Sequence, residues 1–174
     1  MSILKVARMG HPVLRATAPP LDRAALRRPA IQKLVDDMID TMIEYHGAGL
    51  AAPQVHESLR LFVALLGPDE ENAPSDPVVI VNPHIVSVGS ETVDGWEGCL
   101  SVPDIRGRVP RACEIVLRAL DRRGERIELP LREFPARVAQ HEADHLDGVL
   151  LLDRMRTFES LTFLDEYSRY WAKD

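Results

Sequence analysis

The pentapeptide His141-Glu142-Ala143-Asp144-His145 decides most about the fold and chemistry of this chain. Histidines at positions i and i+4 fall on one face of an α-helix, one turn apart, so both imidazoles can bind the same metal ion. Glu142, next to the first histidine, can project toward a water molecule on that metal as a general base. Two solvated histidines on a charged helix face would give the same letters. The pattern nevertheless favours a metal-dependent hydrolytic site on a helix.

The residues on either side of this motif support a helix. Pro135 suits the first turn of a helix, and Gly148 is typical of the position just after one. The apolar residues 149–152 come directly after it. We therefore expect the motif on a helix that the proline opens and the glycine ends.

A catalytic metal site usually has three protein ligands and one position for water, so a third ligand is required. The metzincin pattern H-E-x-x-H-x-x-G-x-x-H would place it at Leu151, which cannot bind a metal, and that class is excluded. A glutamate on a later helix, as in thermolysin-like enzymes, would be Glu159 or Glu166. The upstream candidate is Cys99, because a thiolate with two imidazoles suits a borderline transition metal. The residues alone leave both alternatives open.

The two cysteines differ in their surroundings. Cys99 follows a glycine in a polar turn, where a side chain can be presented to a cleft. Cys113 lies beside the apolar run 115–117 and is expected to be a buried, inert thiol. With one cysteine assigned to a metal, no disulfide framework is left, which is typical of a reducing compartment.

A third segment, Gly47-Ala48-Gly49-Leu50-Ala51-Ala52-Pro53-Gln54-Val55, is small, apolar and flexible at its start. Glycine allows positive φ angles and a close approach of the backbone to a ligand. The side-chain amide of Gln54 can donate a hydrogen bond to a developing oxyanion. Taken alone, the segment indicates only the end of a helix followed by a turn.

Together, the three segments resemble, in order and spacing, the three motifs of the peptide deformylases. The matching residues are Gly47-x-Gly49-Leu50-Ala51-Ala52-x-Gln54, Glu97-Gly98-Cys99-Leu100-Ser101 and Gln140-His141-Glu142-x-Asp144-His145. The resemblance covers nearly the whole chain. Residues 10–15 are similar to the family's N-terminal segment, and the match extends past the second motif through Val102-Pro103, Arg106, Val109-Pro110-Arg111 and Ala119-Leu120-Asp121. It implies an α+β fold with strands wrapped around a central HExxH helix, followed by a C-terminal helix. It also implies removal of the N-formyl group from the formylmethionyl end of new polypeptides, with release of formate.

The resemblance implies one divalent metal ion per chain, held by Cys99, His141 and His145, with water in the fourth position. Glu142 would take a proton from that water as general base and deliver it to the leaving amine as general acid. Fe²⁺ is the expected ion, and Zn²⁺, Ni²⁺ and Co²⁺ also suit the ligand set.

The family's other motif positions imply roles in binding the substrate. The oxyanion would be held by the Gln54 amide and the backbone N–H of Leu100. An extended peptide would pair with the segment near Gly49, and the methionine pocket would include Leu100, Ala48 and Val138. Ala48 is smaller than the β-branched residue often found at this position, which would widen the pocket.

Four further residues have less specific roles. Arg106 would touch the peptide backbone, or lie free on the surface. Asp144 would orient a ligand histidine or pair with Arg111 behind the metal site, or be a solvated carboxylate on the helix face. Trp96, directly before the second motif, would form a wall of the cleft or simply pack.

Length and composition limit the remaining options. The 174 residues suit a single domain, residues 1–174, with a substantial core. A net charge of −6 argues against nonspecific binding to nucleic acid. No apolar stretch is long enough to cross a bilayer, and residues 1–8 lack the apolar core of a signal peptide. We expect a cytoplasmic protein with no membrane partner and no specific nucleic-acid partner.

Apolar periodicity predicts the other elements. Between Pro29 and Gly47 a core-facing helix is expected from the helical spacing of Ile31, Leu34, Val35, Met38, Ile39, Met42 and Ile43. Strands are expected at residues 61–66, 78–81, 85–88, 115–120 and 127–131. The acidic, proline-rich residues 68–77 indicate a surface loop. A C-terminal helix is expected from Phe158, Leu161, Leu164 and Tyr167.

The last segment departs from the best-known bacterial pattern of the family, in which a basic C-terminal helix is associated with ribosome docking. After Leu152 this chain has four basic and five acidic residues. Electrostatic docking of the tail on ribosomal RNA is therefore not expected, although the ribosome stays open as a partner. The apolar residues of the tail suit packing on the body or on a second subunit, so a dimer is an alternative.

Three other functions fit parts of the sequence. A small metallopeptidase would use the two motif histidines and a downstream glutamate. A protein that binds formylated or acetylated peptide ends without turnover would be expected to lack part of the catalytic set, which is complete here. A structural zinc site would need a fourth Cys or His, and the spare candidates Cys113 and His84 lack ligand-like spacing.

Overall fold

The structure is a computed structural model that describes residues 2–67 and 76–172. Most of the surface loop predicted at residues 68–77 lies outside the described residues. In chain order the elements are η1 (Pro12–Arg15), α1 (Arg23–Leu26), α2 (Pro29–Glu44), β1 (Gly49–Ala51), η2 (Ala52–Val55), β2 (Leu61–Ala64), β3 (Val78–Ser87), β4 (Thr92–Cys99), β5 (Val102–Ala112), β6 (Glu114–Leu120), β7 (Arg126–Arg132), α3 (Glu133–Leu146), α4 (Leu151–Arg154), β8 (Thr162–Phe163) and α5 (Leu164–Tyr170).

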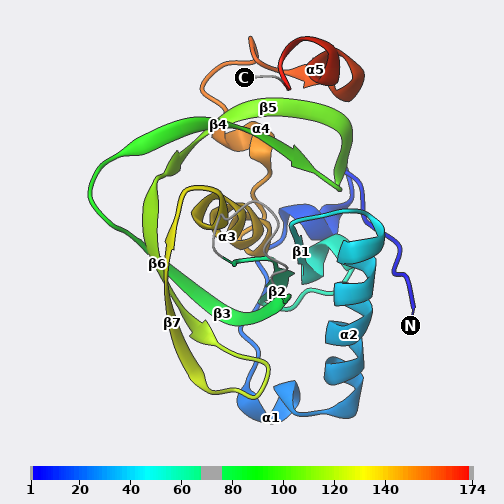
Figure 1. Cartoon of the computed structure of the whole chain (residues 1–174). Helices are drawn as coiled ribbons and strands as arrows, with labels where there is room; N and C mark the ends of the chain where they lie inside the picture. Colours follow the sequence, from blue (N-terminus) through cyan, green and yellow to red (C-terminus); the bar gives the residue numbers. More distant parts are fainter. Residues whose placement is uncertain (1, 68–75, 173–174) are drawn as a thin grey trace.

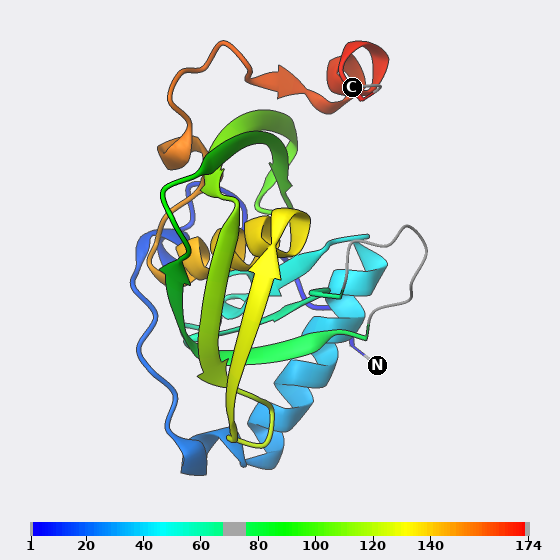
Figure 2. The same cartoon turned by 60° about the vertical axis from the view of Figure 1, so that its left-hand side comes forward.

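Two antiparallel sheets surround helix α3 (Figure 1). The larger sheet has the strand order β1-β2-β3-β6-β7, and the smaller one has the order β4-β5-β8. Helix α2 packs along β1 and β2 on the side away from α3, and α5 lies at the far end of the molecule beyond β5 (Figures 1 and 2). The expected α+β fold, with strands wrapped around the HExxH helix and a C-terminal helix, is therefore confirmed.

Strand β2 is buried along its whole length because both of its faces are covered. Phe62 packs in a core cluster with Val138 of α3. Val63, whose side chain points the opposite way, packs in a second cluster with Met38 of α2. The larger sheet thus separates two apolar cores and holds α3 on its inner side.

Helix α3 is buried on most of its circumference, which is unusual for a helix with so many polar residues. Its buried residues are Pro135, Ala136, Val138, Ala139, His141, Glu142, Asp144, His145 and Leu146. Pro135 lies in its first turn, as predicted, and the helix ends two residues before Gly148. Gly148 has a φ of +72°, and a Cβ there would lie 2.6 Å from the carbonyl oxygen of Arg15. The sequence therefore places the polar HExxH pattern at the centre of the fold.

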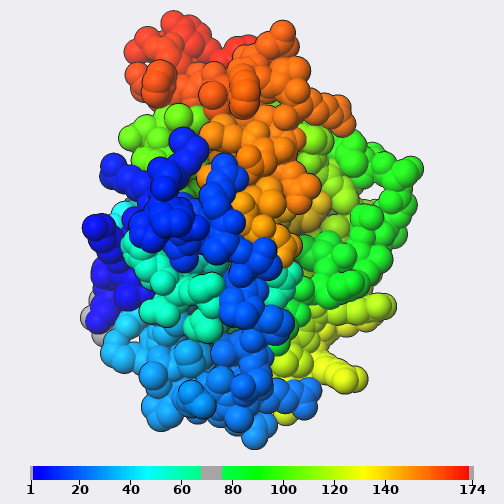
Figure 3. Space-filling model, turned by 180° about the vertical axis from the view of Figure 1, so that it is seen from behind, coloured from blue at the N-terminus to red at the C-terminus, as the bar shows by residue number. Residues whose placement is uncertain are grey.

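The N-terminal segment fixes the end of α3 from behind. Figure 3 shows it beside the segment that follows α3. The backbone N–H of Ala18 donates to the carbonyl of Leu146 at 2.8 Å. Arg15 forms an ion pair with Asp153. The first contact satisfies a carbonyl at the end of α3 that has no helical partner, and the second ties the N-terminal segment to α4.

One long strand, β3, replaces the two short strands predicted at residues 78–81 and 85–88. The register against β6 shifts between Val81 and His84, which marks a β-bulge. Asn82 sits in the bulge with a φ of +51°, and its side chain bonds both backbone groups of Leu21 at 2.8 and 2.9 Å. Pro83 follows Asn82, and a proline inside an apolar run normally indicates the end of a strand. This is why the sequence predicts two short strands here instead of one.

Helix α2 confirms the predicted core-facing helix, with one correction. Val35, Met38 and Met42 are fully buried, but the side chain of Ile43 is 55% exposed. Ile43 follows Met42 by one residue and is rotated about 100° away from the buried stripe. It was therefore wrongly assigned to the core.

The C-terminal helix is shorter than predicted. Phe158 and Leu161 lie before α5 and are 66% and 38% exposed. Residues 162–163 instead form strand β8, which pairs with β5. Pairing with a sheet edge overrides the helical spacing of the apolar residues there. Across the described part of the chain, no helix has the length and apolar character that spanning a membrane requires.

Candidate metal centre and substrate cleft

The end of β4 meets the middle of α3 at a cluster of three side chains that could hold a metal ion. The ligand atoms of Cys99, His141 and His145 all lie within 4.8 Å of one another, and all three residues are buried. The Cys99 Sγ is 3.3 Å from the His145 Nε2. Because His141 and His145 are one helical turn apart, their rings face the same space, with centroids 5.0 Å apart.

Glu97 fixes the orientation of His141. One of its carboxylate oxygens lies 2.9 Å from the His141 Nδ1. The Nδ1–H therefore donates to Glu97, and Nε2 is the ring nitrogen left to face Cys99. The sequence interpretation did not assign Glu97 a role. The period of two in a strand was the available signal, because it places residues 97 and 99 on the same face.

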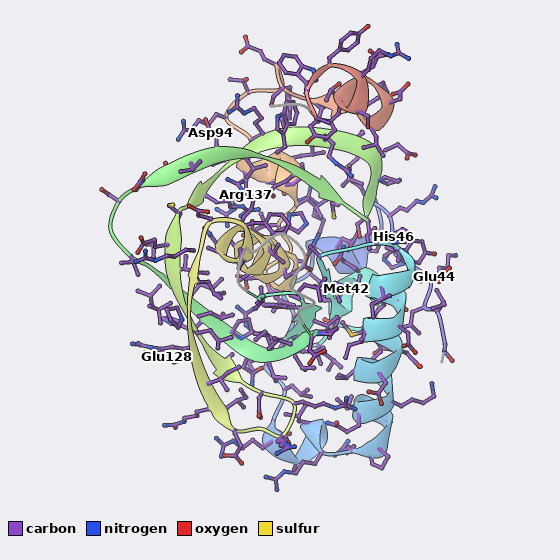
Figure 4. The ribbon with its side chains drawn as sticks, viewed as in Figure 1. Met42, Glu44, His46, Asp94, Glu128 and Arg137 are labelled. Atoms are coloured by element: carbon purple, nitrogen blue, oxygen red, sulfur yellow. The ribbon has the colours of Figure 1, made fainter. Side chains whose placement is uncertain are left out.

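A buried ion network continues from Glu97. Arg111 on β5 donates to both Glu97 oxygens, at 2.9 and 3.0 Å, and to Asp144 at 2.6 Å. Arg137 on α3 donates to Glu97 at 2.9 Å, beneath the β4–β5 hairpin (Figure 4). Arg154 donates to Asp144 at 2.6 Å. The network ties β4 and α3, the two elements that carry the Cys99, His141 and His145 cluster, to β5.

The network determines the charge states of its members. Burial would raise the pKa of Glu97, but hydrogen bonds from His141 and Arg111 outweigh it and hold that pKa at about 2. Burial also opposes the charge on Arg111, yet its two carboxylate partners raise its pKa. Of the two roles expected for Asp144, the structure shows the pair with Arg111. It is Glu97, instead of Asp144, that contacts a cluster histidine.

The cluster fits a divalent transition metal. Burial opposes ionisation of Cys99, but the coulombic interaction with His145 and hydrogen bonds to both histidines lower its pKa well below the ordinary value. Burial opposes a charge on His141 as well, but hydrogen bonds to Cys99 and Glu97 raise its pKa well above the ordinary value. The surroundings thus stabilise a thiolate, which is the form that binds metal. One thiolate and two imidazoles leave a fourth position open in a tetrahedral site.

Glu142 lies beside this cluster without a strong partner. Its Oε2 atom is buried and, among the described residues, has no hydrogen-bond partner. Burial raises the pKa of Glu142 to about 7. On its other side Gly49 approaches so closely that a Cβ there would lie 2.5 Å from the Glu142 Oε1. The carboxyl group is held against a glycine backbone with one oxygen free.

Gln54 reaches the cluster from η2. The backbone N–H of Ala51 donates to its Oε1 at 2.8 Å, which leaves its NH₂ group facing the metal cluster. That Nε2 lies 3.6 Å from the Cys99 Sγ and 3.2 Å from the Ser101 Oγ. Gln54 thus presents a donor to the region where the predicted oxyanion would form.

A cleft of about 760 Å³ opens over the cluster, Glu142 and Gln54. All the residues expected to bind substrate line it. They are Ala48, Gly49, Leu100, Arg106 and Val138. Trp96 and Leu164 also line it, and Leu164 was not predicted to contribute to the site.

The other metal candidates lie elsewhere. Within residues 2–67 and 76–172, the cluster of Cys99 and the two histidines is the sole group of three or more such side chains placed to hold a metal ion. Glu159 lies before β8, next to Thr157, and Glu166 lies on α5. Cys113 is half-buried instead of fully buried, since it sits at the turn between β5 and β6. His84 is exposed on β3.

Comparison with known proteins gives consistent results. The model of the family described as polypeptide deformylase matches residues 3–160. The chain is 41% identical to peptide deformylase 2 of Nostoc sp. over 175 residues, covering 99% of this chain and 97% of that protein. It is 45% identical to peptide deformylase 1 of Prochlorococcus marinus over 172 residues, covering 95% and 88%. A class I type b peptide deformylase from Acinetobacter baumannii superposes with a TM-score of 0.82 at 42% identity, covering 88% of this chain and 100% of that one.

Proposed function

The chain belongs to the polypeptide deformylase family, and from this premise we propose which of its residues carry out the reaction. It is an enzyme that removes the N-formyl group from the N-terminal formylmethionine of newly synthesised polypeptides and releases formate. The family uses a catalytic divalent metal ion. The reaction therefore requires metal ligands, a residue that transfers a proton, and groups that bind the peptide.

We propose that Cys99, His141 and His145 hold the metal ion, and that Fe²⁺ is the native one. The low pKa of the Cys99 thiol and the Nδ1–H bond from His141 to Glu97 support this ligand set. When bound there, the ion supplies Lewis-acid activation of water and of the formyl carbonyl. Zn²⁺, Ni²⁺ and Co²⁺ are alternatives that the same donors accept.

Glu142 is the residue we assign to proton transfer. Its partner-free oxygen lies next to the cluster, where it can take the proton of the attacking water. The same carboxyl group then gives that proton to the methionyl nitrogen as the C–N bond breaks. Formate and a peptide with a free amino terminus leave the site.

Gln54 and the backbone N–H of Leu100 are assigned to the oxyanion. The Oε1 of Gln54 is already engaged by Ala51, so the amide NH₂ is oriented before substrate binds. The peptide would lie extended along Gly49, with its methionine near Ala48 and Val138 and its backbone near Arg106. A structure of the Acinetobacter baumannii relative contains Met-Ala-Ser, a peptide of the product type.

The juxtaposition of a free, buried carboxyl oxygen with the Cys/His/His cluster carries this assignment. It is tested by measuring formate release from formyl-Met-Ala-Ser and acetate release from acetyl-Met-Ala-Ser by anaerobically prepared, Fe²⁺-loaded enzyme. We expect rapid turnover of the formyl peptide only, because the acetyl methyl group crowds the reacting carbon. Cleavage within either peptide, without formate, would instead favour the metallopeptidase alternative.

The metal content of two variants tests the ligand set in the same preparation. Cys99→Ala should lose most of its bound metal, measured by elemental analysis, because the thiolate is the only anionic ligand. Glu159→Ala should keep one ion per chain. The opposite result would show that the third ligand lies downstream.

Gly49→Ala should reduce kcat by roughly 100-fold, because a misplacement of about 1 Å in a catalytic group has an effect of this size. The new Cβ would lie 2.5 Å from the Glu142 Oε1, so the carboxyl group must move. Gly89→Ala, at a position remote from the site with open space around it but a φ of +73°, is a control that includes the backbone cost of replacing a glycine. An unchanged kcat for Gly49→Ala, with a normal fold by circular dichroism, would mean that the position of Glu142 is not critical.

The partners beyond the peptide are also proposals. The tail after Leu152 has no excess of basic residues, so we do not assign it to docking on ribosomal RNA. A dimer through exposed apolar residues of the C-terminal segment is the alternative that light scattering at high protein concentration would reveal.

A further inference from the structure

The chain continues past the residues that match the family model, and this continuation returns to the cleft. The family match ends at residue 160. Residues 161–171, which we name the C-terminal arm, comprise β8 and α5 and cross the outer side of the β4–β5 hairpin (Figures 1 and 2). The arm is therefore positioned against the hairpin that carries the metal ligand Cys99.

Backbone pairing attaches the arm to β5. Strand β8 pairs antiparallel with it, with Phe163 opposite Ile105 and Thr162 opposite Arg106. Just before the arm, the Ser160 Oγ accepts a hydrogen bond from the Arg108 N–H at 3.0 Å. This strand addition fixes the register of the arm on the hairpin, so the first residue of α5 has a defined position.

An aromatic cluster attaches the other end of the arm to β4. The ring of Trp96 lies 5.0 Å from that of Tyr167, inclined at 62°, and 5.9 Å from that of Trp171. These distances are those of favourable aromatic pairs. Because strand residues alternate, Trp96 points to the outer face of the hairpin while Glu97 points to the metal centre.

Between these two attachments, Leu164 reaches the cleft. It lines the same cavity as Trp96 and Arg106, and it is half-buried. The guanidinium group of Arg106 lies directly over Gly98, the residue opposite it on β4, in contact with the space a Cβ would take. The outer end of the cleft therefore has an apolar wall from the arm and one arginine.

We propose that the arm is a wall of the substrate cleft, and that Leu164 contacts the peptide residues that follow the formylated methionine. The inference rests on the proposed function, in which the formyl end lies at the buried cluster. A peptide extends by about 3.3 to 3.6 Å per residue, so the residues after methionine must pass from the buried floor toward the rim. Leu164 and Trp96, both half-exposed, lie at that rim. The enzyme should therefore prefer substrates with an apolar side chain at the second or third residue.

The test compares Leu164→Ala with Leu161→Ala, a leucine of the same arm that is 38% exposed and does not line the cleft. The substrates are formyl-Met-Leu-Leu and formyl-methionine amide. For Leu164→Ala we expect kcat/KM on the tripeptide to fall roughly tenfold, which is the scale of a lost apolar contact in a pocket. The fall should come from a higher KM, with kcat unchanged. The single-residue substrate should be hydrolysed as by the wild type. Leu161→Ala should match the wild type on both.

A second pair of variants tests whether the aromatic cluster positions Leu164. Trp171→Ala removes a contact with Trp96, whereas Tyr170→Ala removes a neighbouring ring that is 64% exposed and contacts Arg169. Only Trp171→Ala should raise KM for the tripeptide, by about threefold, because it loosens Leu164 without deleting it. An equal effect of Leu164→Ala on both substrates, or no effect on either, would overturn the proposal.

Failure of the proposed function gives a different result. If the wild type releases no formate from either substrate, the function is wrong but the wall is still measurable. Binding of the deformylated peptide Met-Leu-Leu by titration calorimetry should then be weaker for Leu164→Ala than for Leu161→Ala. Equal affinities would refute the wall independently of turnover.

Discussion

Glu142→Gln is expected to slow formate release by about 10²- to 10⁴-fold while leaving one metal ion bound per chain. Glutamine has nearly the same shape as glutamate and can remain between Gly49 and the cluster. It cannot accept a proton at neutral pH, so both proton transfers lose their carrier. The free Oε2 of Glu142 is the atom whose chemistry the substitution removes.

The measurement is kcat on formyl-Met-Ala-Ser, with metal content determined on the same sample. Glu133→Gln is the matched control, because Glu133 is an exposed glutamate in the first turn of the same helix. It should retain the wild-type rate. A Glu142→Gln enzyme with more than about a tenth of the wild-type rate and full metal content would exclude Glu142 as the acid–base residue.

Arg111→Leu is expected to destabilise the folded chain by about 3–5 kcal/mol, the usual cost of removing one partner from a buried ion pair. The side chain of Arg111 is 5% exposed and contacts Glu97 and Asp144, which are themselves 4% and 10% exposed. Loss of the guanidinium group leaves the buried carboxylates of Glu97 and Asp144 with fewer positively charged partners. The unfolding midpoint should fall by about 6–20 °C for a chain of this length.

Urea denaturation of the metal-free protein measures this effect without a contribution from metal binding. Arg118→Leu is the control, because the ion pair of Arg118 with Glu128 is 60% exposed on both sides and should contribute less than about 1 kcal/mol. An equal loss of unfolding free energy in the two variants would mean that water replaces the hydrogen bonds of Arg111 in the buried network. A larger loss for Arg111→Leu would show that the hairpin and α3 are held together through Glu97 and Asp144.

The sequence predicts the helices and the apolar strands well because their signals are local. Helix α2 follows from the spacing of Val35, Met38 and Met42, and α3 from the proline and glycine at its ends. Strand β2 follows from an uninterrupted apolar run. In each of these elements, the pattern of apolar residues over a short stretch of sequence is enough to predict the type of element and the face that is buried.

The β4–β5 hairpin has no such signal. Residues 92–112 contain glycines, prolines and charged residues and lack a clear apolar alternation. The hairpin is stabilised by partners remote in sequence, such as Arg137, whose guanidinium donates to the Val109 carbonyl at 2.7 Å. Gly95 and Gly98 make room for the guanidinium groups of Arg137 and Arg106. Interactions of this kind appear only when the chain is folded.

The candidate site shows the same division. The residues expected to bind metal came from short motifs, and the structure brings Cys99, His141 and His145 into one cluster. Glu97 lies within the second motif, but the sequence does not predict its role. That role is to hold the ring of His141, and it becomes visible only when the fold shows which histidine contacts the carboxylate. Leu164 was identified only as a helix residue, since nothing local indicates that the end of a chain returns to a cleft formed mainly by residues 45–142.

The cluster joins residues that lie 42 positions apart along the chain, from Cys99 at the end of β4 to His141 in α3. In an unfolded chain these donors are not close together, so a metal ion should bind the folded state far more tightly. Folding and metal occupancy are then thermodynamically linked. Once the free ion exceeds its dissociation constant, each further tenfold increase in concentration stabilises the protein by about 1.4 kcal/mol. Stability of this enzyme is therefore a property of its surroundings as well as of its sequence, and a metal-starved cell would hold a chain that unfolds more readily.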